Sequence, residues 1–261
     1  RARQTREQMR AARPKDAHSW DQAVAHARLI HPDTPQATGD DLAVILHTGG
    51  TNGVPKSVPL THRNIGTNVN QCRMWVWKLH EGAETFYSLL PYFHAYGLTF
   101  FMCAAVHLAA TQLLLPKFDV DLALEAHKRR PVTFFVGVPP MFERVMNRAA
   151  EKNVSLKTIK WSICGAMPLS KTLAPQWEEA TDGMIIEGYG MSETSPVIAG
   201  SPLADNRYHG ALGVVFPSTD VRLVDLEDPS IDVEDGTPGE IIVKGPQVFS
   251  GYLDAPEETA R

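Results

Sequence analysis

Residues 159–193 read IKWSICGAMPLSKTLAPQWEEATDGMIIEGYGMSE and carry the clearest signal of the chain's architecture. Two apolar runs, at residues 159–164 and 184–187, enclose a stretch at residues 170–180 whose amphipathic pattern predicts a helix. Buried strands that alternate with helices are typical of an α/β fold with a parallel sheet. The segment therefore predicts one strand–helix–strand unit of such a fold.

The same alternation continues upstream. Further apolar runs predict strands at residues 42–47, 85–90, 111–115 and 132–136, and amphipathic stretches predict helices at residues 63–78, 98–109, 120–128 and 140–151. We therefore expect a mostly parallel sheet flanked by helices. After about residue 210 the pattern changes, because residues 221–225 and 240–244 alternate apolar and polar side chains, which predicts a small antiparallel β unit at the C-terminal end.

These patterns divide the chain into three predicted parts. Residues 1–39 are interpreted as a basic helix and loop, because residues 1–15 hold six Lys or Arg and a single Glu. Residues 40–204 are the expected α/β core, and residues 205–261 are the small β subdomain. The chain starts with Arg, and its last residues, PEETAR, are typical of the start of a helix. We therefore expect it to be a piece of a larger protein whose β subdomain is truncated.

The composition is that of an ordinary globular protein. A hydrophobic content of 43%, a charged content of 21% and a net charge of −5 exclude a disordered chain and a strongly basic nucleic-acid binder. Three cysteines without a CxxC pair exclude a disulfide framework and a structural zinc site, and they favour a reducing cytoplasm. The apolar stretch at residues 98–115 includes His107, Thr111 and Gln112. We interpret it as a buried helix followed by a buried strand, not as a membrane span.

Small, hydroxyl-bearing or ionisable residues follow four of the apolar runs directly. These four loops are TGGTNG at residues 48–53, PYFH at 91–94, GAMP at 165–168 and YGMSE at 189–193. In open α/β sheets, ligands bind outside the carboxyl ends of the strands. The sequence therefore predicts that the four loops line one cleft.

The first of these loops has the length of a Walker A phosphate-binding loop. Its residues 50–57, GTNGVPKS, place Pro55 where that pattern has its second Gly, and Pro59 would disrupt the helix that should follow. These prolines argue against a P-loop NTPase. The glycines, two Thr hydroxyls, the Asn amide and Lys56 are nevertheless suited to wrapping a polyphosphate, because they supply hydrogen-bond donors and a positive charge.

Five segments, in this order, resemble the motifs of the adenylate-forming superfamily, which holds acyl- and aryl-CoA synthetases, luciferases and the adenylation domains of peptide synthetases. The segments are HTGGTNGVPKSVPLTH at residues 47–62, LPYFHAYG at 90–97, CGAMPLS at 164–170, EGYGMSET at 187–194 and GEIIVKGPQVFSGY at 239–252. The sequence departs from the usual motifs at Asn52, where Thr is common, and at Ser57, where Gly is common, but both keep hydrogen-bond donors. Gly49 resembles the variant of bacterial long-chain fatty acyl-CoA ligases, and Ser192 keeps the hydroxyl of the usual Thr.

The resemblance implies a first half-reaction in which a carboxylate attacks the α-phosphorus of ATP and releases pyrophosphate. It implies four catalytic residues: Lys56 on the β- and γ-phosphates, Ser192 on the α-phosphate, Glu193 on Mg²⁺, and His94 at the mouth of the acyl site. Those implied to bind ATP are Thr48, Gly49, Gly50, Thr51, Asn52, Gly53, Lys56, Gly165, Ala166, Met167, Glu187, Gly188, Tyr189, Gly190, Met191 and Ser192.

Among these ATP-binding residues, the backbone at residues 165–167 would pass beside the adenine, and Tyr189 would pack on the base or ribose. Four aromatic residues near the predicted acyl site are interpreted as core residues: Tyr92, Phe93, Phe100 and Phe101.

The implied activity is that of an AMP-forming acid–thiol ligase of lipid metabolism, which joins a fatty acid to CoA through an acyl-AMP and uses Mg²⁺. The family's ribose-binding Asp, in a TGD motif, and its adenylation Lys would lie beyond residue 261. The chain therefore resembles the central half of an acyl-CoA synthetase, and we expect this piece alone not to catalyse efficient adenylation.

Several alternatives remain open from the sequence. Within the superfamily, the acid could be aryl or medium-chain, whereas an amino-acid adenylation domain is disfavoured because FH stands at residues 93–94 where such domains usually have FD. A luciferase-like oxygenase is also disfavoured. Outside the enzymes, the chain could be a non-catalytic nucleotide-binding remnant or a protein-binding α/β scaffold. Peripheral membrane association and the oligomeric state are left open.

Overall fold

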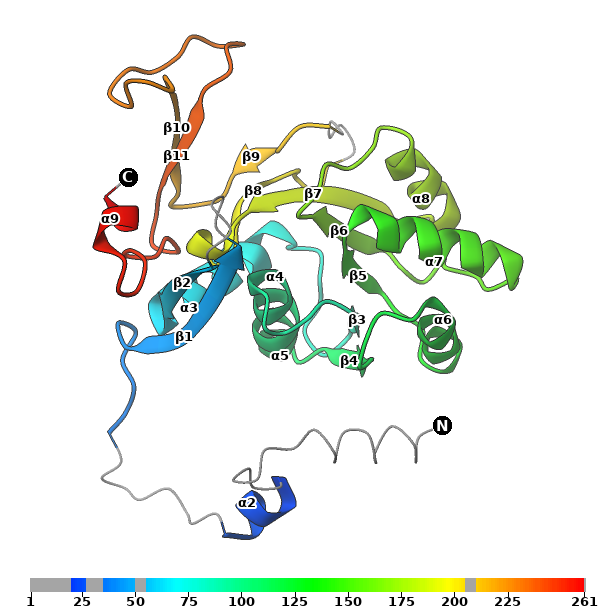
Figure 1. Cartoon of the computed structure of the whole chain (residues 1–261). Coiled ribbons are helices and arrows are strands. Elements are labelled where there is room, and N and C mark those ends of the chain that lie inside the picture. The colour runs from blue at the N-terminus through cyan, green and yellow to red at the C-terminus, as the bar shows by residue number, and fades with distance from the viewer. Residues whose placement is uncertain (1–19, 27–34, 50–54, 205–209, 261) are drawn as a thin grey trace. The chain divides into compact units, whose positions relative to one another are not determined.

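The computed structural model describes residues 20–26, 35–49, 55–204 and 210–260 (Figure 1). Internal contacts divide the chain into two units, Arg1–Ala37 and Thr38–Arg261. The first unit contains the helix α2 (Trp20–His26). The basic helix predicted within residues 1–15 lies outside the described residues. The proposed division at residue 204 remains a prediction.

The second unit is built on a seven-stranded sheet with the strand order β4-β3-β5-β6-β7-β8-β9. Neighbouring strands from β4 to β7 are parallel, and β8 and β9 continue the sheet in antiparallel pairing. The strands are β3 (Thr85–Ser88), β4 (Thr111–Leu114), β5 (Phe134–Gly137), β6 (Trp161–Gly165), β7 (Met184–Gly190), β8 (Val197–Gly200) and β9 (Val214–Val215). The predicted α/β fold with a mostly parallel sheet is confirmed.

Helices cover both faces of this sheet, with α6, α7 and α8 on one face and α3, α4, η1 and α5 on the other (Figure 1). Their bounds are α3 (His62–Trp75), α4 (Ala95–Gly97), the π-helix η1 (Leu98–Ala104), α5 (Ala105–His107), α6 (Val120–Arg129), α7 (Pro139–Glu151) and α8 (Leu173–Thr181). Successive side chains of a strand point to opposite faces. Phe135 therefore packs with α6–α8, whereas Phe134 and Val136 pack with α3 and η1.

The stretch at residues 98–115 forms a helical segment and then a strand, as predicted, but the strand is not buried. β4 is the edge strand of the sheet, and the side chain of Leu114 is 68% exposed. An apolar run alone cannot distinguish an edge strand from a central one. Within the described residues, no helix combines the length and apolar character that a membrane crossing needs.

The apolar run at residues 42–47 is not part of the parallel sheet, and this prediction was wrong. β1 (Leu42–Gly49) pairs antiparallel with β2 (Pro55–Thr61) in a separate two-stranded sheet. Residues 50–54 are too few for the crossover of a dozen or more residues that a parallel neighbour requires, whereas an antiparallel hairpin needs only a short turn.

The C-terminal part contains the predicted antiparallel pair. β10 (Asp220–Val224) and β11 (Glu240–Lys244) pair in register from Asp220–Lys244 to Val224–Glu240. The chain ends with the short helix α9 (Pro256–Thr259), which follows the tyrosine of the last predicted motif. β11 thus delivers the segment at residues 245–255 back toward β2, where the backbone N–H of Leu253 donates to the carbonyl of Ser57 at 3.0 Å.

We predict that Trp177→Ala lowers the free energy of unfolding by about 3–5 kcal/mol, the usual cost of truncating a buried Trp. Trp177 is fully buried, packs edge-on against Phe142 at 4.8 Å and donates from Nε1 to Ser162 Oγ at 2.9 Å. Urea unfolding followed by circular dichroism measures the change. The control is Trp77→Ala, because Trp77 is 62% exposed and should change the free energy by roughly 0.5 kcal/mol or less. Equal effects of the two variants would contradict the described core.

Candidate functional site

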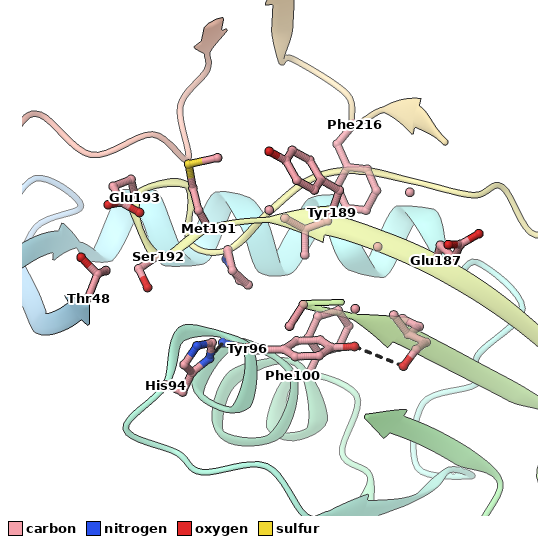
Figure 2. Close-up of a pocket in the computed structure, with 18 of the residues that line it drawn as sticks. Thr48, His94, Tyr96, Phe100, Glu187, Tyr189, Met191, Ser192, Glu193 and Phe216 are labelled. Carbon is pink, nitrogen blue, oxygen red and sulfur yellow. Dashed lines mark hydrogen bonds between the residues drawn. The ribbon is translucent and has the colours of Figure 1, made fainter. Parts of the chain in front are cut away.

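A cavity of about 460 Å³ lies where β6 and β7 end (Figure 2). Its lining joins all four loops predicted to meet and the tyrosine of the GEIIVKGPQVFSGY segment. The loop at residues 48–53 contributes its described residues Thr48 and Gly49 at the end of β1, and the loop after β3 contributes His94. The lining residues are Thr48, Gly49, Lys56, Trp75, His94, Tyr96, Phe100, Ile163, Gly165, Ala166, Ile186, Glu187, Gly188, Tyr189, Gly190, Met191, Ser192, Glu193, Pro196, Val197, Gly200, Phe216 and Tyr252.

Most of the described residues implied by the motif resemblance line this one cavity. Gly50, Thr51, Asn52 and Gly53 lie outside the described residues, although Gly49 and Lys56 on either side of them are lining residues. Met167 is not in the lining, and its side chain is 54% exposed. The structure thus brings both ends of the glycine-rich segment together with the turn that carries Ser192 and Glu193.

Ser192 and Glu193 lie in a tight turn between β7 and β8. The turn contains the short 3-10 helix η2 (Ser192–Thr194) and closes through the Met191 N–H, which donates to the Pro196 carbonyl at 2.9 Å. Gly190 allows this closure, because a Cβ atom at that position would overlap the Pro196 carbonyl. Thr194 reinforces it by donating from Oγ1 to the same carbonyl. The geometry of the turn therefore requires glycine at position 190.

A stripe of three buried amide side chains on α3, at Asn64, Asn68 and Gln71, holds this turn in place. These residues are spaced by four and three positions, so they share one face of the helix. Asn68 makes a two-point bond to Val197: Nδ2 donates to the carbonyl at 2.8 Å, and Oδ1 accepts from the N–H at 3.1 Å. Asn64 Nδ2 donates to the carbonyl of Pro246 at 2.9 Å. The amide stripe therefore connects α3 to two of the segments that form the cavity.

Further hydrogen bonds reach the turn from other elements. Thr99 in η1 donates from Oγ1 to the carbonyl of Ser195 at 2.7 Å, and Ser195 donates from Oγ to the carbonyl of Gln247 at 2.9 Å. Burying a polar group costs several kcal/mol of free energy unless a hydrogen bond compensates for the lost hydration. Because these pairings are made from several directions, the turn has little freedom to move, and Glu193 is held at a defined position.

The anionic end of the cavity is formed by Glu193 with Tyr252 and Lys56. The Tyr252 hydroxyl donates to Glu193 Oε1 at 2.8 Å, and Lys56 Nζ lies 4.8 Å from the centre of the Tyr252 ring. Lys56 also forms an ion pair with Glu258 of α9 at 2.7 Å. Lys56, which the resemblance assigns to phosphate, therefore has a carboxylate partner of its own in this structure.

Thr48 and His94 lie near the same end of the cavity as Ser192 and Glu193 (Figure 2). His94 precedes α4 and accepts at Nδ1 from the backbone N–H of Tyr96 at 3.2 Å, which fixes the orientation of the ring. Because Nδ1 accepts this hydrogen bond, the neutral ring carries its proton on Nε2. Nε2 can therefore donate a hydrogen bond to an acid.

Gly165, Ala166 and Glu187 form the opposite end of the cavity. Ala166 has a φ of +62°, a left-handed conformation that costs a non-glycine residue energy and is often found at functional sites. Glu187 accepts at Oε2 from the backbone N–H of Gly210 at 2.8 Å. Figure 2 shows Glu187 and Glu193 on opposite sides of the view, so the lining residues extend along β7 and the turn that follows it.

Between these ends the cavity has an apolar wall that the sequence analysis did not predict. It is made of Trp75, Tyr96, Phe100, Ile163, Ile186, Val197 and Phe216. Trp75 stacks on Phe216 with ring centres 4.4 Å apart, and Tyr96 donates from its hydroxyl to the Ile163 carbonyl at 3.1 Å. The spacing of apolar residues along α3 could have indicated that Trp75 faces the core, but Phe216 belongs to no periodic pattern in the sequence.

The four aromatic residues interpreted as core differ in their surroundings. Phe101 is fully buried, as predicted, and Phe100 is buried and also lines the cavity. Phe93 is 83% exposed and Tyr92 is 37% exposed, so the core interpretation was wrong for both. Both residues lie in the turn before α4, and this turn leaves their side chains outside the packed core.

The side chains present limit the chemistry of the site. Within the described parts of the chain, no three His, Cys, Asp or Glu side chains are grouped so that they could hold a metal ion by themselves. Burial raises the pKa of the Cys164 thiol to about 12, so it stays protonated and is a poor nucleophile. Glu193, with one oxygen bonded to Tyr252, instead fits a Mg²⁺ ion that arrives on phosphate groups, which commonly takes only one or two protein carboxylates.

Comparisons with known proteins agree on one family. The model of the AMP-binding enzyme family matches residues 2–253. A long-chain-fatty-acid–CoA ligase of Bacillus subtilis (strain 168) is 38% identical over 220 residues, which cover 84% of this chain and 39% of the ligase. The 4-coumarate–CoA ligase 1 of Arabidopsis thaliana is 31% identical over 243 residues, which cover 87% of this chain and 42% of the ligase. The chain thus spans less than half of each of these relatives.

A solved structure gives the same result for the fold. The crystal structure of ATP-bound MatB from Rhodopseudomonas palustris superposes on this chain with a TM-score of 0.80 and 30% sequence identity. The superposition covers 92% of this chain and 46% of MatB. The described fold is therefore that of the corresponding segment of MatB, which is a longer chain.

We predict that Asn68→Leu lowers the free energy of unfolding by about 2–5 kcal/mol, because it leaves the N–H and the carbonyl of Val197 buried without partners. Leu has the same number and branching of side-chain heavy atoms as Asn but cannot form hydrogen bonds. The measurement is urea unfolding. Asn70→Leu on the same helix is the matched control, since Asn70 is exposed, and it should change stability by roughly 0.5 kcal/mol or less. A neutral Asn68→Leu would show that the amide stripe does not hold the turn.

We also predict that Glu258→Gln strengthens ATP binding by about two- to five-fold, the range expected for a partly exposed ion pair. The reason is that phosphate groups must compete with the Glu258 carboxylate for Lys56. Isothermal titration calorimetry at two salt concentrations measures the effect. Glu257→Gln is the control, because it removes a neighbouring charge of the same helix. An equal gain from both variants would indicate a general charge effect, not release of Lys56.

Proposed function

This chain belongs to the AMP-binding enzyme family, and we propose that it forms the nucleotide- and acyl-binding core of an AMP-forming acid–thiol ligase. The observation that carries the proposal is that one cavity unites the two ends of the glycine-rich segment with Ser192, Glu193 and the Gly165–Ala166 backbone. The glycine-rich segment is separated from the other groups by more than a hundred residues in the sequence. A structural role does not require donors, a lysine and a carboxylate to line a common cavity.

The proposed reaction has two steps. A carboxylate oxygen of the acid attacks the α-phosphorus of ATP, so that an acyl–phosphate bond forms and the bond to the leaving pyrophosphate breaks. The thiolate of CoA then attacks the acyl carbon and releases AMP. In the first step Lys56 and the backbone at Thr48 and Gly49 would neutralise the leaving pyrophosphate, and Ser192 would donate to the α-phosphate. His94 would orient the acid through its Nε2 proton.

Glu193 would hold Mg²⁺ on the phosphate groups, and the ion would supply the charge stabilisation that phosphoryl transfer needs. The opposite end of the cavity would take the adenosine, with the Gly165–Ala166 backbone against the base and Tyr189 beside it. The spread of the lining residues along β7, from Glu187 to Glu193, supports this placement of the base and the phosphates, because a nucleotide is itself extended from base to γ-phosphate (Figure 2).

For the acid, we propose a fatty acid. The apolar wall between the two ends offers aromatic and aliphatic side chains and few polar groups, which suits an acyl chain. The Bacillus subtilis relative is named for long-chain fatty acids, and the Arabidopsis thaliana relative is named for 4-coumarate. An aromatic acid is therefore the second candidate.

The first experiment tests nucleotide binding by the 261-residue chain. We expect calorimetry to show heat on addition of ATP with Mg²⁺, and Glu193→Ala to weaken this binding by at least about 10-fold, as loss of groups around a metal does. Glu179→Ala, which removes an exposed carboxylate on α8, is the matched control and should bind normally. If the chain takes up no ATP with Mg²⁺, the proposed function is wrong.

The second experiment identifies the acid. A chimera in which residues 38–261 replace the matching segment of the Bacillus subtilis ligase is assayed with saturated fatty acids of increasing length, 4-coumarate and benzoate. Hydroxylamine traps the acyl-adenylate, and AMP release after addition of CoA reports the complete reaction. Trapping that rises with chain length supports the fatty-acid proposal, whereas preference for the aromatic acids favours the second candidate. The isolated chain should give little trapping by comparison.

A further inference from the structure

Tyr252 makes a contact with Glu193 that the proposed reaction does not yet use. Its hydroxyl donates to Glu193 Oε1 at 2.8 Å. The backbone of Glu193 is held from the same segment, because the N–H of Phe249 donates to the Glu193 carbonyl at 2.9 Å. The segment at residues 249–252 therefore fixes both the main chain and one carboxylate oxygen of Glu193, although 59 residues separate Tyr252 from Glu193.

The position of the hydroxyl is itself fixed by packing around the tyrosine ring. Phe249 packs edge-on against the ring with centres 4.9 Å apart, and Lys56 Nζ lies over its face at 4.8 Å. The backbone N–H of Tyr252 donates to Thr259 Oγ1 at 2.9 Å. Contacts on the ring and on the backbone thus hold the hydroxyl so that it points toward Glu193.

The hydroxyl supplies the hydrogen of this contact, because a carboxylate oxygen can only accept. A phenol hydroxyl can donate one hydrogen bond to a carboxylate without adding negative charge beside the phosphates.

We propose that Tyr252 is a positioning residue for Glu193: its hydroxyl fixes one carboxylate oxygen so that the other faces the Mg²⁺ carried by ATP. The inference rests on the proposed function of the cavity. Hydrogen bonds from outside the metal's own ligands set the orientation and basicity of those ligands. A carboxylate on a rotatable side chain would otherwise sample several rotamers and would lose entropy each time the nucleotide binds.

The experiment compares Tyr252→Phe with the unchanged 261-residue chain by calorimetry with ATP, once with saturating Mg²⁺ and once with EDTA. Phe keeps the ring that packs on Phe249 and under Lys56, and it removes only the hydroxyl. We expect ATP binding with Mg²⁺ to weaken by roughly 10-fold, and the Mg²⁺ concentration at half-maximal binding to rise by a similar factor. Binding without the metal should stay within about two-fold.

Tyr92→Phe is the matched control. It also removes a tyrosine hydroxyl that forms a hydrogen bond, here to Gln112 Oε1 at 2.9 Å, but Tyr92 does not line the cavity. We expect it to leave both titrations unchanged. Thermal unfolding of each variant shows whether the fold is intact before binding is compared.

A double variant separates positioning from packing. If the hydroxyl acts through the carboxylate, then Tyr252→Phe should have no further effect on ATP binding in a Glu193→Ala background. Weakening by the same factor with and without Mg²⁺, or a full additive effect in the double variant, would overturn the inference. If the unchanged chain binds ATP with Mg²⁺ and Tyr252→Phe binds equally well, the inference alone fails. If the unchanged chain shows no binding, the proposed function fails first.

Discussion

The two-point hydrogen bond between the Asn68 side chain and the backbone of Val197 is the constraint on which the site depends. Val197 begins β8, immediately after the turn that carries Ser192 and Glu193. Both of its peptide groups are buried and therefore need partners, and the Asn68 amide supplies a donor and an acceptor at the required spacing. The position of β8 relative to α3 is thereby set, and the turn between β7 and β8 has only one way to close. A short turn can therefore be held in a precise position.

The sheet was predictable because its signal is local. Consecutive apolar residues such as Phe134 and Phe135 point to opposite faces of a central strand. Helices long enough to cross the sheet separate such strands in the sequence. The loops that reach the cavity were predictable because parallel strands end at one edge. The hairpin of β1 and β2 was not, because LAVILH has the composition of a central strand and its partner contains two prolines. β8 and β9 are too short to show any period.

The candidate site was predictable in its motif residues but not in the residues that support them. A buried Asn or Gln on a helix, such as Asn68, interrupts the apolar pattern and looks in sequence like a solvent-facing residue. Its partner is a backbone group 129 residues away, which no local pattern reveals. The same is true of Tyr252, whose motif was evident whereas its contact with Glu193 was not. Motifs indicate which segments meet, and only the fold shows which atoms of those segments touch.

The charges at the anionic end of the cavity bear on the proposed binding of metal and nucleotide. Among the described lining residues Lys56 is the one Lys or Arg. It pairs with Glu258 and lies over the ring of Tyr252, whose hydroxyl donates to Glu193. One positive and two negative side chains make this end unfavourable for the bare triphosphate, which is itself strongly anionic. A divalent cation held by Glu193 would reverse the balance, because it would offset the negative charge of the carboxylate and the phosphates and leave Lys56 to the remaining charge. Under the proposed function, this charge distribution would favour entry of ATP together with its metal, and the orientation of Glu193 would directly influence nucleotide affinity.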